Sequence, residues 1–205
     1  MADFDQYMLS EYEYCDSNIK FIHEQRDRWI RYYIGLIGAL QGIPIAVVTV
    51  LSVRGVKFDA SYFRPFLCAS SLLLYGIGVL VFMTCVYARC RTTEFTNELN
   101  RIRGLILAKS DEGIEKASSS VLPTETTISA YQVTGADFFR HLAVMFLLSL
   151  FVSVLIMTLL GSFTGPAILL ASLGFFLSVA CLLYVRRYIL ISFDKILQER
   201  LKEDT

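Results

Sequence analysis

Long stretches without charged residues divide this sequence. No Asp, Glu, Lys or Arg occurs in the 22 residues 32–53 or in the 24 residues 65–88. A charge at the centre of a bilayer costs about 2.5 to 3.5 kcal/mol on insertion scales. About 20 apolar residues in a helix are enough to cross the hydrocarbon core of a membrane. The two stretches therefore predict a first and a second membrane-spanning helix.

A third stretch is long enough for two further crossings. The 45 residues 141–185 carry no formal charge, and the sequence GSFTGP interrupts them at 161–166. Gly and Pro are typical of turns, so the pattern predicts a third span at 142–160, a tight external turn and a fourth span at 167–185. Backbone groups must be paired within lipid, which favours helices. The expected fold is all-α, a polytopic membrane protein with four transmembrane helices.

The distribution of basic residues predicts an orientation. Four crossings place both termini and the central segment 89–140 on one side, with 54–64 as a loop on the other. Sixteen Lys and Arg residues lie on the first side and three on the second. Cytoplasmic segments carry the excess of basic residues, so 1–31, 89–140 and 186–205 are expected to be cytoplasmic.

The predicted cytoplasmic segments contain helical stripes of apolar residues. The residues recur every three or four positions in 1–31 and again after the second span, and the fourth span is expected to continue into a helical tail. Such amphipathic helices either form a bundle or lie on the membrane surface. Residues 118–129, rich in Ser and Thr, are expected to form a mobile loop. The candidates for contact with a partner are Tyr12, Ile19, Ile22, Phe95, Leu99, Ile102 and Ile106.

Aromatic and basic residues precede the first span. Trp29, Tyr32 and Tyr33 occur beside Arg31 at the point where the apolar stretch begins. Tryptophan and tyrosine are enriched where membrane proteins meet lipid headgroups. These four residues are therefore predicted to be interfacial anchors. His141, beside Arg140 at the start of the third span, is expected to mark the membrane boundary there.

The first span also contains small residues and a polar amide. Gly38 and Gly42 form a GxxxG motif with Gly35 one turn earlier, which allows helices to approach closely within one subunit or between subunits. Gln41 lies near the middle of the span, beside Pro44. A glutamine in lipid needs a polar partner. It is expected either to bond to a neighbouring helix or to line a polar pore in an oligomer.

Composition supports a membrane protein and excludes several functions. The chain is 55% hydrophobic, with equal numbers of acidic and basic residues, so nucleic acid is not an expected partner. The spans lack the ionisable groups that ion-coupled transporters use. No nucleotide-binding, zinc or nucleophile motif is present, so no cofactor, metal or catalytic residue is predicted, and an enzyme is not expected. Three cysteines in the apolar stretches are expected to behave as small buried hydrophobes: Cys68, Cys85 and Cys181.

Two segments carry a resemblance in layout. EQRDRWIRYYIGLIGA enters the first span and ARCRTTEFTNELNRIRG leaves the second. This arrangement resembles small uncharacterised bacterial inner-membrane proteins, some of them similar to membrane effectors of anti-phage systems. The third and fourth spans depart from effectors with two helices. The resemblance implies a homo-oligomer in the inner membrane that perturbs the bilayer in response to a cytoplasmic signal.

Two functional hypotheses follow. In the first, the chain is a non-enzymatic, channel-like effector whose cytoplasmic helices sense a protein or a small molecule and whose spans gate or perturb the membrane. In the second, it is a membrane scaffold or anchor that recruits a cytoplasmic partner without conducting. The lipid bilayer is a partner in both.

Overall fold

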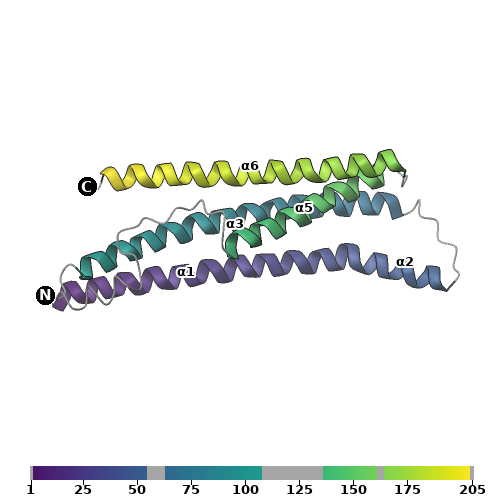
Figure 1. Cartoon of the computed structure of the whole chain (residues 1–205). Helices are drawn as coiled ribbons and strands as arrows, with labels where there is room; N and C mark the ends of the chain where they lie inside the picture. The colour runs from purple at the N-terminus through teal and green to yellow at the C-terminus, as the bar shows by residue number, and fades with distance from the viewer. Residues whose placement is uncertain (1, 55–62, 108–135, 161–163, 204–205) are drawn as a thin grey trace. The chain divides into compact units, whose positions relative to one another are not determined.

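The computed structural model describes residues 2–54, 63–107, 136–160 and 164–203, and they are helical almost throughout (Figure 1). No strand occurs in these ranges. The 28 residues 108–135, which include the predicted mobile loop, and most of the predicted external loop lie outside them. The elements are α1 (Ala2–Ile37), the π-helix η1 (Gly38–Gly42), α2 (Ile43–Val53), α3 (Phe63–Leu107), α5 (Ala136–Leu160) and α6 (Gly165–Glu203).

Four helical stretches are long and apolar enough to cross a membrane. They comprise 46, 42, 25 and 35 residues, and each contains the nearly charge-free window that a span requires. The all-α class and the four helices of membrane-spanning length are therefore confirmed for the described residues. The stretches are Gln6–Leu51, Phe63–Gly104, Ala136–Leu160 and Gly165–Glu199.

Three of these helices are longer than the predicted spans. α1, α3 and α6 continue without a break through the predicted ends at 31, 88 and 185. Charged residues such as Arg and Glu have good helix propensity, so leaving the apolar stretch does not end the helix. The predicted turn 161–166 is too long, because α6 already begins at Gly165. Proline lacks a backbone N–H group, and the N–H groups in the first turn of a helix have no acceptor within that helix. Pro166 therefore fits at the start of α6.

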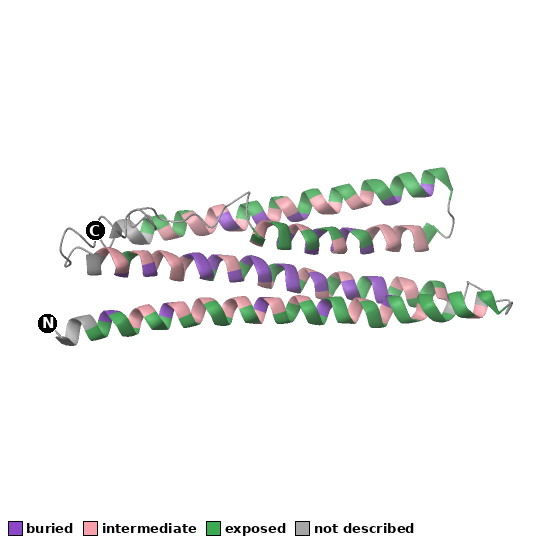
Figure 2. Ribbon diagram, turned by 60° about the horizontal axis from the view of Figure 1, so that its bottom comes forward, coloured by how far each residue is buried: buried purple, intermediate pink, exposed green. Residues whose placement is uncertain are grey.

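The chain divides into two compact units. The first, here called the extension unit, comprises Met1–Arg26, Tyr87–Gln132 and Ile189–Thr205. The second, here called the span unit, comprises Asp27–Val86 and Val133–Tyr188. Buried residues are most frequent along α3, whereas much of α1 and α6 is exposed (Figure 2).

The core of the span unit forms where α1, α3 and α5 meet. Its buried residues are Tyr33, Leu74, Val81, Cys85 and Phe151. The hydroxyl of Tyr33 donates a hydrogen bond to the carbonyl of Leu74, with 3.0 Å between the oxygens. This bond satisfies a polar group that would be costly to bury alone.

Gly78 permits this close packing. A Cβ atom at position 78 would collide with the hydroxyl of Tyr33 and with the side chain of Leu148. Any larger residue at this position would force Tyr33 or Leu148 to shift, so glycine favours the close approach of α1 and α5 to α3.

A seam of small residues packs α6 against α5. Ala167 and Ala171 are buried, and a Cβ atom at Gly174 would meet the side chain of Ile156. The hydroxyl of Ser153 donates to the carbonyl of Ala171 at 2.9 Å. Small residues and hydroxyl groups commonly join helices in membranes.

Arg64 caps the carboxyl end of α5. Its Nε atom donates to the carbonyl of Thr158 at 2.6 Å, and its Nη2 atom donates to the carbonyl of Leu159. The last carbonyls of a helix have no partner within that helix, and they attract a cation. Arg64, predicted to be a loop residue, thus lies in α3 and caps a neighbouring helix.

Candidate functional site

Pro44 accounts for the π-helical turn in the first predicted span. Proline has no N–H group and its ring collides with the carbonyl four residues earlier, which here belongs to Leu40. The preceding turn widens, so the N–H of Ile43 bonds to the carbonyl of Gly38. π turns of this kind are frequent at functional sites.

Gln41 lies in this wide turn and faces α3. Its side chain is 9% exposed. Its Nε2 atom donates to the hydroxyl of Ser70 at 2.8 Å and lies 3.3 Å from the hydroxyl of Ser71. Of the two environments expected for this amide, the contact with a neighbouring helix is the one present. Gln41, Ser70 and Ser71 are called the Gln41 site below.

The glycines of the predicted GxxxG motif are not packed against any described neighbour. Gly35, Gly38 and Gly42 are exposed, and a Cβ atom at any of them would meet no described atom within 4 Å. Close packing of these glycines within one subunit is therefore absent from the described structure. Packing between subunits is the alternative that this face still allows. The three residues are called the glycine face below.

The predicted interfacial anchors fall on different faces of α1. Trp29 is 52% exposed and Tyr32 is 66% exposed, and Arg31 is exposed too. The prediction is wrong for Tyr33, which is 2% exposed and belongs to the core. Consecutive helical residues point about 100° apart, so Tyr32 and Tyr33 differ although they are adjacent.

The predicted partner-facing residues mostly pack against each other. In the extension unit Leu99 and Ile102 of α3 are buried with Met8 and Cys15 of α1. Tyr12, Ile19 and Phe95 pack around this cluster, and Ile22 is half-buried. The prediction of a partner-facing surface is therefore wrong for Leu99 and Ile102, because the two apolar stripes cover each other. The side chain of Ile106 lies outside the described part of α3.

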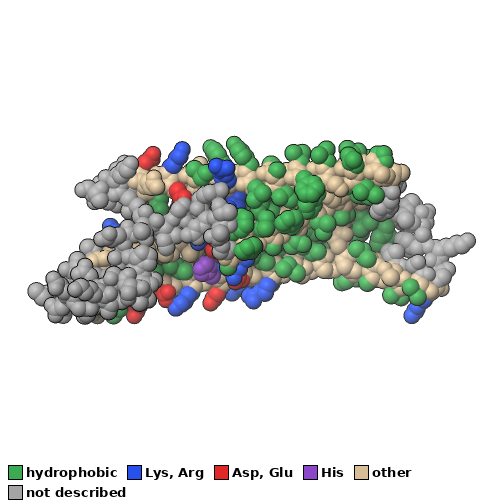
Figure 3. Space-filling model, viewed as in Figure 1, with side chains coloured by type: hydrophobic (Ala, Val, Ile, Leu, Met, Phe, Trp, Pro, Cys, Tyr) green, Lys and Arg blue, Asp and Glu red, His purple; other side chains and the backbone are tan. Residues whose placement is uncertain are grey.

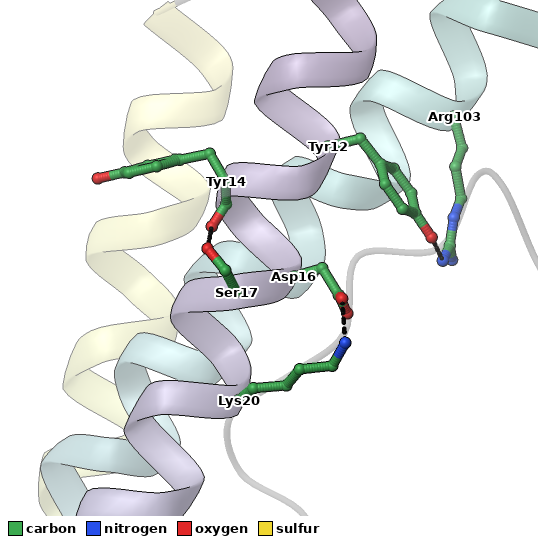
Figure 4. A network of polar contacts seen from close by, with 6 residues as sticks. All are labelled: Tyr12, Tyr14, Asp16, Ser17, Lys20 and Arg103. Carbon is green, nitrogen blue, oxygen red and sulfur yellow. Dashed lines mark hydrogen bonds and ion pairs between the residues drawn. The ribbon is translucent and has the colours of Figure 1, made fainter.

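A polar contact supports this pairing of α1 and α3. Arg103 donates to the hydroxyl of Tyr12 at 2.8 Å, and its guanidinium lies 5.4 Å from the centre of that ring (Figure 4). Within α1 itself, Lys20 and Asp16 form an ion pair at 2.6 Å, and the hydrogen bond to Asp16 raises the pKa of Lys20. An exposed pair of this kind contributes little to stability.

Another face of the same segment of α1 carries exposed aromatic residues. Tyr7, Tyr14 and Phe21 are seven residues apart and 57 to 60% exposed. They form the aromatic stripe of the extension unit, which the sequence analysis did not identify. Large exposed apolar surfaces outside a membrane commonly mark contact sites.

His141 and Arg186 form a buried pair that the sequence analysis also missed. The Nε of Arg186 donates to the Nδ1 of His141 at 3.0 Å, and the two residues are 4% and 1% exposed, respectively. The guanidinium lies 5.1 Å from the ring of Phe138, and the ring of Phe82 meets His141 edge-on. The acceptor role requires an unprotonated Nδ1. His141 is thus a packed polar residue.

The cysteines of the predicted spans differ in exposure. Cys85 is buried and Cys68 is half-buried, but Cys181 is exposed. The expectation of a buried residue is therefore wrong for Cys181.

Two thiols of the extension unit are poor nucleophiles. Burial, followed by the negative charge of Asp194, raises the pKa of Cys90 to about 11. Burial, followed by the charge of Glu98, raises the pKa of Cys15. The thiolate is the reactive form, so at neutral pH both groups are chemically quiet.

No protein-family model matches the chain, and no curated protein or solved structure matches it in the comparisons made.

Proposed function

We propose that the chain is a non-enzymatic membrane protein that assembles with copies of itself and gates or perturbs the bilayer. Its four helices of membrane-spanning length support a place in a membrane. The excess of basic residues on one side favours a cytoplasmic location of both termini, and the resemblance in layout suggests a bacterial inner membrane. In this proposal the extension unit receives a signal from a cytoplasmic protein or small molecule, as in an antiviral effector.

The glycine face is the observation that carries the proposal. Gly35, Gly38 and Gly42 expose backbone that lipid chains pack against poorly, and no described residue of the same chain covers it. Lipid chains are as apolar as the side chains of a helix, so the hydrophobic effect does not drive helices together inside a membrane. Association depends instead on close packing, which small residues such as glycine allow. A second copy can place its own glycine face against this one.

Gly38→Leu is expected to disperse the oligomer and to leave the subunit folded. The new side chain projects into open space within the subunit but prevents backbone contact between subunits. The association constant should fall roughly tenfold or more. It can be measured by energy transfer between labelled copies in vesicles of varied protein-to-lipid ratio.

Gly76→Leu is the matched control, because Gly76 also has open space around it but lies outside the motif. Both variants should melt at or above the wild-type temperature, since leucine favours helix more than glycine does. Equal association of wild type and Gly38→Leu would show that the glycine face is not the contact.

The Gln41 site supports a gating role for the same region. The π turn and Pro44 weaken the backbone of the first span, and one side-chain amide joins this weak point to α3. Hinges often coincide with such interruptions of the helical hydrogen bonds. In our proposal the bond from Gln41 to Ser70 is a latch that holds the closed state.

Gln41→Leu is expected to increase leakage of a trapped dye from protein-containing vesicles by several-fold. The leucine fills a similar volume but cannot bond to Ser70 or Ser71. Membrane interhelical hydrogen bonds contribute on the order of 0.6 to 2 kcal/mol, which corresponds to a shift of about threefold to thirtyfold between two states.

Thr49→Val is the control for this experiment. The hydroxyl of Thr49 donates a hydrogen bond to the carbonyl of Ile45 in its own helix, and among the described residues no hydrogen bond links it to another helix. Its removal should leave leakage unchanged. Leakage that stays at background for wild type and Gln41→Leu alike, with normal insertion and assembly, would exclude the gating proposal.

One observation favours the second candidate function, a scaffold. The side chains of the aromatic stripe, Tyr7, Tyr14 and Phe21, are each more than half exposed, although the ring of Tyr14 meets Phe95 edge-on. The stripe lies on the unit that holds the predicted cytoplasmic helices. A scaffold would bind its partner there and need no conduction. Vesicles that never leak, together with intact assembly, would favour this reading.

A further inference from the structure

Exposed aromatic residues gather at one end of the span unit. They come from three helices, α1, α5 and α6, and each is more than half exposed. On α6 the rings of Tyr184 and Tyr188 stack at 6.5 Å. In Figure 3, hydrophobic side chains cover the visible face of the span helices, and Lys and Arg side chains lie where that surface ends. The aromatic residues are Trp29, Tyr32, Phe139, Tyr184 and Tyr188.

Exposed arginines accompany these rings. The segments 27–32, 137–141 and 184–188 contain five arginines and two aspartates. Asp137 pairs with Arg140 at 3.2 Å, and Arg186 is buried beside His141. The exposed arginines are Arg28, Arg31, Arg140 and Arg187, and with the five rings they form what is here called the basic belt.

Contacts inside the span unit place α1 and α5 at one level. Tyr33 of α1 and Leu148 of α5 both lie against Gly78. Arg28 precedes Tyr33 by five residues and Arg140 precedes Leu148 by eight, or about 7.5 and 12 Å along a helix. The two arginines therefore differ by less than about one helical turn in depth.

The buried pair brings α6 to the same level. His141 bonds to Arg186, so Arg187 and Tyr188 lie beside the start of α5. On the other side of Arg186, an exposed apolar face of α6 continues through Leu177, Leu173 and Leu169. A lipid-facing surface thus ends at two tyrosines and an arginine.

We propose that the basic belt binds the headgroups of anionic phospholipids. Arginine presents a planar fork of donors that fits phosphate oxygens. Tyrosine and tryptophan settle at the depth of the headgroups. A zwitterionic lipid brings a cation with its phosphate, whereas an anionic lipid does not, so the excess of arginine favours the anionic lipid. The inference rests on the proposed membrane location, and it requires neither assembly nor gating.

Trp29 reports directly on this contact, because it is the only tryptophan of the chain. The full-length protein is placed in vesicles that contain either phosphatidylglycerol or phosphatidylcholine with brominated acyl chains, which quench tryptophan on contact. At equal bromination, quenching should indicate a roughly fivefold preference for phosphatidylglycerol around Trp29. High salt should reduce the preference.

The double variant Arg28→Gln and Arg31→Gln should lose most of the preference and keep the quenching itself. Arg54→Gln is the matched control, because Arg54 is exposed at the opposite end of the first span and should leave the preference unchanged. Equal quenching by both lipids in the wild type would overturn the anionic preference and leave the membrane location intact. No quenching by either lipid would overturn both.

Discussion

Gly78→Leu is expected to unfold the packing of the span unit. The new side chain would overlap the hydroxyl of Tyr33 and the side chain of Leu148, which approach α3 from two other helices. Overpacking a core costs about 1 to 3 kcal/mol, and a collision that involves two helices belongs at the upper end. The bond from Tyr33 to the carbonyl of Leu74 would also be lost. Thermal unfolding in detergent, followed by circular dichroism, measures the loss.

Gly76→Leu provides the comparison for this variant too. The two glycines are separated by one residue in α3, and both are predicted to lie in the second span. A Cβ atom at Gly76 meets no described atom, so its variant should unfold at or above the wild-type temperature. If both variants lose the same stability, the close approach at Gly78 is not what holds the three helices together.

His141→Leu is expected to destabilise the junction of α5 and α6 by about 2 kcal/mol. Arg186 is almost fully buried, and leucine removes the nitrogen that accepts its Nε–H. A hydrogen bond to a charged group contributes about 1.5 to 3 kcal/mol to stability. Without the acceptor nitrogen of His141, the buried guanidinium of Arg186 loses this contribution. Denaturant titration in mixed micelles gives the change in free energy of unfolding.

His141→Asn tests whether the acceptor is responsible. The Oδ1 of asparagine stands where the Nδ1 of histidine stood, two bonds beyond Cβ, so Arg186 keeps its acceptor. The edge contact with Phe82 is lost, which should cost about 0.5 to 1.5 kcal/mol. Asparagine should therefore recover part of the stability that leucine loses. Equal losses in the two variants would assign the effect to the shape of the ring instead.

The number and approximate ends of the span-length helices could be predicted from charge spacing alone. α2 ends at Val53 and α5 ends at Leu160, where the first and third spans were expected to end. The limits at 31, 88 and 185 were less predictable, because α1, α3 and α6 continue through them. The helices extend beyond the apolar stretches, because charge limits how much of a helix lies in lipid but does not limit the helix itself.

The candidate sites were only partly predictable. Gln41 could be singled out as an amide that needs a partner, but nothing in its own sequence identifies Ser70, 29 positions away, as that partner. Gly78 carries no motif and proved to be tightly packed, whereas the GxxxG motif proved to be open. A GxxxG motif shows only that its residues permit close packing of helices. Whether packing occurs depends on which helix lies next to the motif.

By itself, the sequence determined the all-α class of the described residues and their four helices suited to a membrane. That result depends on the cost of placing each charge in lipid, which is a property of single residues and adds along the chain. The tertiary structure decided which face of each helix is covered: Tyr33 inside and Tyr32 outside, and Leu99 and Ile102 against α1. Those outcomes depend on pairs of residues far apart in sequence, because burial requires a second surface of complementary shape.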